Sequence, residues 1–172
     1  PMEVDRFETR QITLLGLGFF GNPFEVSGGW TEENEIGRLW SRFMACLERH
    51  GDEIHGAVTQ QVAFELHVEH DETRQTGEHE VFVGLEVEAL EEVPVQLSAK
   101  VLPLTTYAVF VLRGQEIVSD WGQQIYGQWL PDSGYRSEGT WGLQRYDERF
   151  KGLERLDESL IEVYVPVRRA GD

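Results

Sequence analysis

The residues best suited to bind or react with a ligand lie near the C-terminus, in the segment from 139 to about 146. Its composition predicts a β-strand, in which alternation puts Gln144 and Tyr146 on one face and Leu143 and Arg145 on the other. A polar amide beside aromatic rings is typical of a lined cavity rather than of a plain apolar core. We therefore expect this strand to contribute to a ligand-binding site.

Two further predicted strands carry aromatic and acidic side chains at alternating positions. In the strand 160–167 Glu162 and Tyr164 share a face, and in the strand 80–90 Phe82 and Glu86 share one. If the helices cover the aliphatic faces, the faces that carry Phe82, Gln144, Tyr146 and Tyr164 look the other way and line a pocket. Ring faces attract flat and cationic molecules. The alternative is that the tyrosines are half-exposed sheet residues. The expected ligand-binding residues are Phe82, Glu86, Trp141, Gln144, Tyr146 and Tyr164.

Known catalytic and cofactor signatures are missing from the sequence. It has no glycine-rich phosphate loop, no G-x-S-x-G motif and no HExxH motif, so no cofactor is expected. Cys46 lies on the apolar side of a predicted helix, which does not favour a nucleophilic role. His67, His70 and His79 match no zinc-binding spacing, and solvated loop residues explain them as well. No metal site is expected.

Composition limits the possible partners. The 172 residues include 15 basic and 31 acidic side chains, a net charge of −16. Direct nucleic-acid binding and binding to anionic membranes are therefore not expected, whereas cationic ligands are attracted. An acidic surface can equally serve solubility or contact a protein partner. One cysteine, no apolar run of membrane-spanning length and no visible signal peptide predict a cytoplasmic protein. Pro1 before Met2 is interpreted as a cleavage remnant on a stand-alone protein, with a domain excised from a longer regulator as the alternative.

Periodic apolar residues predict two helices. The first, starting near Thr31 or Asn34 and ending at His50-Gly51, carries a stripe typical of a face packed on a sheet. The second runs from about Gln115 to Leu130, and Pro131 is expected to end it. The stripe of the first helix consists of Ile36, Leu39, Trp40, Phe43, Met44 and Leu47.

The order of predicted elements repeats. Strands at 12–20, 57–68 and 80–90 surround the first helix, and strands at 96–112, 139–146 and 160–167 surround the second. Residues 81–87 and 161–167 also look alike. We therefore predict a single α+β domain, 1–172, made of two βαββ pseudo-repeats, about 2–93 and 94–172, with antiparallel sheets and a ligand groove between the repeats.

Several stretches resemble the GyrI-like, or bacterial effector-binding, domains that occur alone and in AraC- and MerR-type regulators. The resemblance implies a SOUL-like, pseudo-twofold fold with a central groove that binds cationic, aromatic, drug-like compounds. The matching stretches are 39–43, 107–110, 125–135, 146–150 and 163–167.

One departure from the family concerns position 144. The resemblance implies a buried glutamate there, and this chain has Gln144. In the family this glutamate neutralises cationic ligands, and in one subset it performs acid/base chemistry, which makes Gln144 with Tyr164 the candidate catalytic position. Glutamine keeps a hydrogen-bonding oxygen but loses the charge and the proton. Either the natural ligands are less charged or Gln144 replaces a native glutamate; Glu86 or Glu162 are possible substitutes for the missing carboxylate.

The expected function is binding of small aromatic, cationic drug-like molecules in an aromatic pocket. Two alternatives remain open. The first is a hydrolase that detoxifies reactive cyclopropane-type compounds through position 144. The second is an acidic, gyrase-inhibitor-like interaction protein or the ligand-sensing domain of a transcriptional regulator, since a charge of −16 suits either role.

Overall fold

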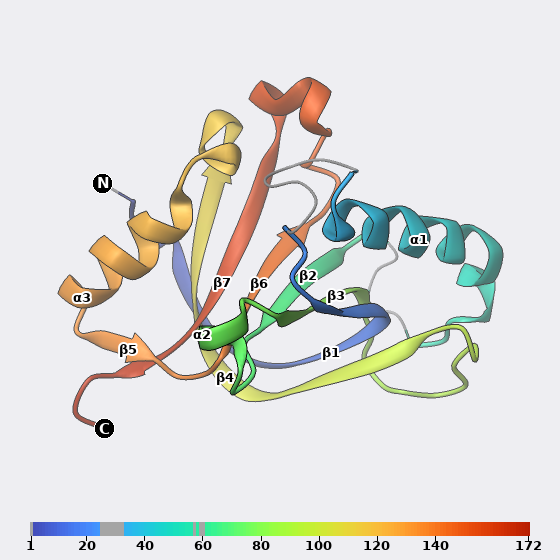
Figure 1. Cartoon of the computed structure of the whole chain (residues 1–172), viewed down its shortest axis with the longest axis horizontal. Helices are drawn as coiled ribbons and strands as arrows, with labels where there is room; N and C mark the ends of the chain where they lie inside the picture. Colours follow the sequence, from blue (N-terminus) through green and yellow to red (C-terminus); the bar gives the residue numbers. More distant parts are fainter. Residues whose placement is uncertain (1, 25–32, 57, 59–60) are drawn as a thin grey trace. The chain divides into compact units, whose positions relative to one another are not determined.

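The protein has the predicted α+β fold. A computed structural model describes residues 2–24, 33–56, 58 and 61–172 (Figure 1). The strands are β1 (Arg6–Gly21), β2 (Ala63–Val68), β3 (His79–Glu86), β4 (Ser98–Arg113), β5 (Tyr135–Ser137), β6 (Trp141–Tyr146) and β7 (Leu160–Arg169). The helices are α1 (Glu35–His50), α2 (Thr73–Thr76) and α3 (Leu130–Asp132), with 3-10 turns at Gly51–Glu53, Gly114–Val118 and Leu153–Glu158 and a π-helix at Gln123–Trp129.

The chain forms two compact units. The central unit comprises Ile12–Leu102, and the terminal unit comprises Pro1–Gln11 together with Pro103–Asp172. The long strands β1 and β4 each contribute residues to both units. Within each unit the elements follow the predicted order of strand, helix and two further strands, with the short β5 as an unpredicted addition.

In the central unit β3 lies between β1 and β2 and pairs antiparallel with both. Val81, Val83 and Leu85 point to one face, where they pack in one core with Leu39 and Phe43 of α1. The alternation predicted for this strand is confirmed, and Phe82 lies on the other face. Glycines allow close backbone approach here, since a Cβ on Gly16 would lie 1.8 Å from the Val83 carbonyl oxygen.

Helix α1 confirms the first predicted helix. Asn34 caps it, with its side chain accepting a hydrogen bond from the Gly37 amide at 3.0 Å. The other predicted start, Thr31, lies outside the described residues. The predicted apolar stripe is only partly buried: Leu39 and Phe43 are in the core, whereas Met44 is 56% exposed. The segment between β2 and β3, predicted as a loop, contains the single helical turn α2.

In the terminal unit β7 lies between β4 and β6 and pairs antiparallel with both. Its far end also pairs with β5. One face of this sheet is covered by the second helix, because Trp129 packs edge-on against Phe110 of β4 at 4.9 Å between ring centroids. We call this side the helix face of the terminal unit.

The second helix differs from its predicted bounds. A 3-10 turn occupies Gly114–Val118, a π-helix runs through Gln123–Trp129, and α3 extends past Pro131 to Asp132. Pro131 does not end the helix because it lies in the first turn of α3, where a proline needs no amide partner. The π-helical register is marked by the Leu130 amide, which donates to the Ile125 carbonyl five residues back.

Across the described residues, every helix is too short or too polar to cross a membrane.

Candidate ligand-binding residues

Strand register in the terminal unit divides the predicted site residues between two faces. Tyr164 of β7 lies opposite Leu143 of β6, and Gln144 lies opposite Val163. Directly paired residues of antiparallel strands point to the same side. Val163 also pairs with Phe110, so Gln144 lies on the helix face and Tyr164 on the opposite one. The expectation that these two side chains look the same way is therefore wrong.

Three aromatic rings gather on the side of Tyr164, which we call the tyrosine face and define by Tyr107, Trp141 and Tyr164. The rings of Tyr107 and Tyr164 lie 5.7 Å apart, tilted by 58°. The Trp141 indole N–H donates to the Tyr107 hydroxyl at 3.3 Å. The Trp141 ring lies over Gly139, where a Cβ would approach within 2.2 Å of it. The tyrosine face therefore combines two of the predicted ligand-binding residues, Trp141 and Tyr164, with Tyr107, which was not predicted.

Glu8 of β1 brings a carboxylate to the tyrosine face. The Tyr164 hydroxyl donates to Glu8 Oε2 at 3.1 Å, and Arg6 approaches the same hydroxyl at 3.3 Å. Glu8 is also paired with Arg6 at 2.9 Å and with Arg10 at 3.5 Å. Burial opposes ionisation of Glu8, but the contacts with Arg6, Tyr164 and Arg10 outweigh it and lower the pKa of its carboxyl group. Glu8 is therefore an ionised group next to aromatic rings.

Glu162, a possible substitute for the missing carboxylate, is already neutralised. Its side chain is only 4% exposed and is paired with Arg6, with Arg149 at 2.5 Å and with Arg145 at 3.7 Å. Arg145 of β6 and Arg149 of the following turn also pair with Asp147, at 2.5 and 2.8 Å respectively. Although burial raises the pKa of Asp147, hydrogen bonds from Arg149 lower it to about 2. These acids are occupied by arginines and not available to a cationic ligand.

The two tyrosine hydroxyls stay protonated. Burial, followed by the charges of Glu8 and Glu162, raises the pKa of Tyr164 to about 12. Burial also raises the pKa of Tyr107. Both groups therefore act as neutral hydrogen-bonding phenols at neutral pH, and neither supplies a phenolate for catalysis.

On the helix face, Gln144 and Tyr146 form a polar pair. The Tyr146 hydroxyl donates to Gln144 Oε1 at 2.8 Å, and the Tyr146 ring packs edge-on against Phe150. The Tyr126 hydroxyl lies near Gly142, two residues before Gln144 in β6. A Cβ on Gly142 would be 3.3 Å from that hydroxyl. The amide of Gln144 thus has a defined orientation set by a neighbouring phenol.

The remaining two predicted residues belong to the central unit. Phe82 is buried against Gly18 on the face away from α1, as expected from alternation. Glu86 ends β3 on the same face and is also buried. The six predicted residues are therefore distributed over two units and, within the terminal unit, over two faces.

A second polar pair in the central unit was missed by sequence reasoning. Glu65 of β2 is buried and accepts a hydrogen bond from the Trp40 indole at 2.7 Å, while its other oxygen contacts His67 Nε2 at 2.6 Å. His67 Nδ1 lies 3.1 Å from His79 Nε2. A usable signal existed, because an acid or amide two residues before a histidine or tyrosine occurs in both repeats, at Glu65 and at Gln144.

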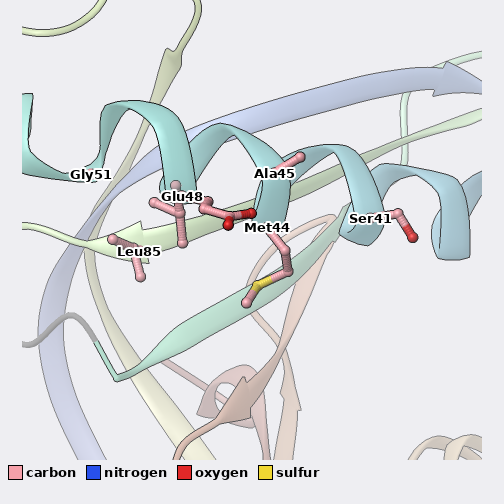
Figure 2. A pocket seen from close by; sticks show the side chains of 7 residues that line it. Ser41, Met44, Ala45, Glu48, Gly51 and Leu85 are labelled. Carbon is pink, nitrogen blue, oxygen red and sulfur yellow. The ribbon is translucent and has the colours of Figure 1, made fainter.

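In the described parts of the chain, no group of three His, Cys, Asp or Glu side chains is arranged so that it could hold a metal ion. Two hollows lie along α1. Figure 2 shows the larger, about 640 Å³, where the side chains of Met44 and Glu48 project from the helix on the side of Leu85. The smaller, about 270 Å³, is bordered by Cys46, Arg42 and Arg49. Neither hollow contains a predicted ligand-binding residue.

The fold is that of a GyrI-like effector-binding domain, a class that binds small molecules. The chain belongs to the family of integron-associated effector binding proteins, whose match spans residues 8–167. A search of curated proteins finds no match to the chain.

Several solved structures share the fold at low sequence identity. SAV2435 bound to tetraphenylphosphonium is 11% identical, with a TM-score of 0.64 over 97% of this chain and 94% of that one. A putative bacterial transcription regulation protein from Staphylococcus aureus is 12% identical, with a TM-score of 0.64 over 98% and 99%. An integron cassette protein from Vibrio cholerae is 13% identical, with a TM-score of 0.61 over 97% of both chains.

Proposed function

We propose that this effector-binding protein takes small aromatic molecules, lipophilic cations among them, as its ligands. The observation that carries the proposal is the tyrosine face, in which the half-buried Trp141 donates to the buried Tyr107, the Tyr107 ring lies against the buried Tyr164, and the Tyr164 hydroxyl donates to the ionised Glu8. Aromatic faces attract flat and cationic groups, and a nearby carboxylate adds a charge of the right sign. The net charge of −16 favours the approach of cations.

The balance of charge on this face favours ligands with large aromatic area over ligands with high charge. Glu8 and Glu162 are both paired with arginines, so ring contacts supply most of the recognition. Gln144 lies on the opposite, helix face, where its amide can hydrogen-bond but carries no charge. The likeness to SAV2435, which was solved with tetraphenylphosphonium, makes that cation a reasonable first probe.

Isothermal titration with tetraphenylphosphonium tests the proposal. We expect saturable binding that Trp141→Ala weakens by about 30-fold, since a cation–π contact with a desolvated ring contributes on the order of 2 kcal/mol. The matched control is Trp121→Ala in the second helix, outside the tyrosine face, which should leave the affinity unchanged. Lack of saturable binding to this cation and to a panel of neutral aromatic compounds would refute the proposal.

Position 144 gives little support to the alternative that the protein is a hydrolase. An amide has no proton to transfer in acid/base catalysis, and the pKa values of Tyr107 and Tyr164 are raised rather than lowered. The Gln144→Glu variant separates the two functions. If the protein is a binder whose ligand lies on the tyrosine face, this variant should bind tetraphenylphosphonium about as well as the wild type and acquire no turnover of cyclopropane-type substrates.

A further inference from the structure

The smaller hollow along α1 combines apolar and basic side chains. It has a volume of about 270 Å³, and all of its lining residues belong to the central unit. Leu17 of β1 and Cys46 of α1 are half-buried and pack against the core of this unit, so they provide apolar surface. Most ligand pockets measure roughly 300–1,000 Å³, and a space of this size therefore suits a small molecule.

Arginine side chains lie beside this apolar surface. Arg42, Cys46 and Arg49 follow one another at spacings of four and three residues, so they share one face of α1. Within the described parts of the chain neither of these two arginines takes part in an ion pair, unlike Arg38 of the same helix, which pairs with Glu35 at 2.6 Å. The guanidinium groups of Arg42 and Arg49 are therefore available to an external anion.

The helix dipole accounts for only part of this charge. Arg49 and His50 lie in the last turn of α1, where basic side chains are favoured, and His50 is occupied by Glu53 at 2.6 Å. Arg42 lies about two turns earlier, beyond the reach of that effect. The acidic Glu48 borders the larger hollow instead (Figure 2). In a chain with 31 acidic and 15 basic residues, the smaller hollow is thus bordered, among the described residues, by basic and no acidic side chains.

We propose that this hollow binds a small organic anion, a monocarboxylate with a compact apolar body. The carboxylate lies between Arg42 and Arg49, because guanidinium groups match the geometry of a carboxylate and form charge-assisted hydrogen bonds with it. The amide of Gln96, which precedes β4, is a further donor, and the apolar body of the ligand rests on Leu17 and Cys46. This site goes beyond the proposed function, since it belongs to the central unit and the tyrosine face belongs to the terminal unit.

The thiol of Cys46 reports directly on the hollow, because Cys46 is the only cysteine among the 172 residues and borders it. Iodoacetate is a small carboxylate, and iodoacetamide is its neutral counterpart of nearly the same shape. If the hollow attracts carboxylates, native Cys46 should favour iodoacetate over iodoacetamide more strongly than the same cysteine does in urea-unfolded protein. Added salt should reduce this preference by screening the arginines.

Benzoate and benzamide test binding itself, since they have nearly the same shape and differ in charge. Each is added in increasing concentration at an ionic strength held constant with sodium chloride. The rate at which iodoacetamide alkylates Cys46 is followed by mass spectrometry of the intact protein. We expect saturable protection of Cys46 by benzoate and much weaker protection by benzamide.

The variants Arg42→Gln and Arg49→Gln identify the groups that bind the carboxylate. Each should raise the half-protecting concentration of benzoate by about fivefold, the effect of losing one charged contact at an exposed site, and each should lower the preference for iodoacetate. Arg38→Gln is the matched control, because Arg38 lies on the same helix and does not border the hollow. All three side chains are exposed, and thermal unfolding checks that the variants are folded.

Equal protection by benzoate and benzamide, or protection by benzoate that survives both arginine substitutions, would overturn the inference. A native Cys46 that reacts with neither reagent would do the same, because the hollow would then admit no small molecule. The titration with tetraphenylphosphonium is read independently. A failure of cation binding refutes the proposed function and leaves this site standing, and a failure of benzoate protection does the reverse.

Discussion

Removing the charge of Glu162 should strongly destabilise the terminal unit. The Glu162→Gln substitution keeps the shape of the side chain but leaves Arg6, Arg145 and Arg149 without a shared anion at a position only 4% exposed. Breaking a buried ion pair by removal of one partner costs 3–5 kcal/mol at most sites, as an order of magnitude. The arginines here are partly exposed and keep Glu8 and Asp147 as partners, so we expect about 3 kcal/mol.

The matched control is Glu158→Gln. Glu158 pairs with Arg155 at 2.5 Å, but their side chains are 58% and 62% exposed. Such a surface pair contributes less than about 1 kcal/mol and is screened by salt. Urea denaturation at neutral pH, in low and in high salt, measures the free energy of unfolding of both variants. High salt should remove the effect of Glu158→Gln and preserve that of Glu162→Gln.

A loss within about 1 kcal/mol of the control would refute this reasoning, because it would mean that the three arginines find other partners or water at no cost when Glu162 loses its charge.

Two further predictions concern packing and pH. Gly16→Ala places a methyl group 1.8 Å from the Val83 carbonyl oxygen and should lower the free energy of unfolding by about 3 kcal/mol or more. Gly51 has a right-handed helical conformation with nothing within 4 Å of an added Cβ, so Gly51→Ala should raise the free energy of unfolding by about 0.4–1 kcal/mol. Thermal unfolding measures both changes. The pKa of Tyr164 is raised from 10.0 to about 12, so its contribution to stability is complete below pH 10 and is lost as the pH rises toward 12. Tyr164→Phe should remove that part of the alkaline loss in denaturation measured across this range, and an unchanged alkaline profile would contradict the assigned pKa.

Most elements of the fold follow from local patterns in the sequence. The apolar spacing of α1, its Asn34 cap and the alternation of Val81, Val83 and Leu85 each reflect interactions within a few residues of chain. The second helix was harder to predict, because its π-helical turn and its continuation through Pro131 depend on backbone hydrogen bonds that side-chain periodicity does not report.

The sequence by itself determined that Gln144 alternates with Leu143, and that Glu162 and Tyr164 share a face. It also determined the excess of acidic residues and, through its motifs, the effector-binding family. Alternation assigns two faces to each strand, but it does not say which faces of different strands coincide.

Only the tertiary structure decided that question, because cross-strand hydrogen bonds set the register. The pairing of Gln144 with Val163, which also pairs with Phe110, puts Gln144 on the helix face. The pairing of β4 with β7 brings Tyr107 against Tyr164, although the two tyrosines are far apart in the sequence. In the same way, the pairing of Glu65 with Val83 gives Glu65 the position in the central unit that Gln144 has in the terminal unit. Glu65 thus carries a carboxylate at the position of the central unit that corresponds to Gln144 of the terminal unit, and this carboxylate contacts His67 Nε2 at 2.6 Å.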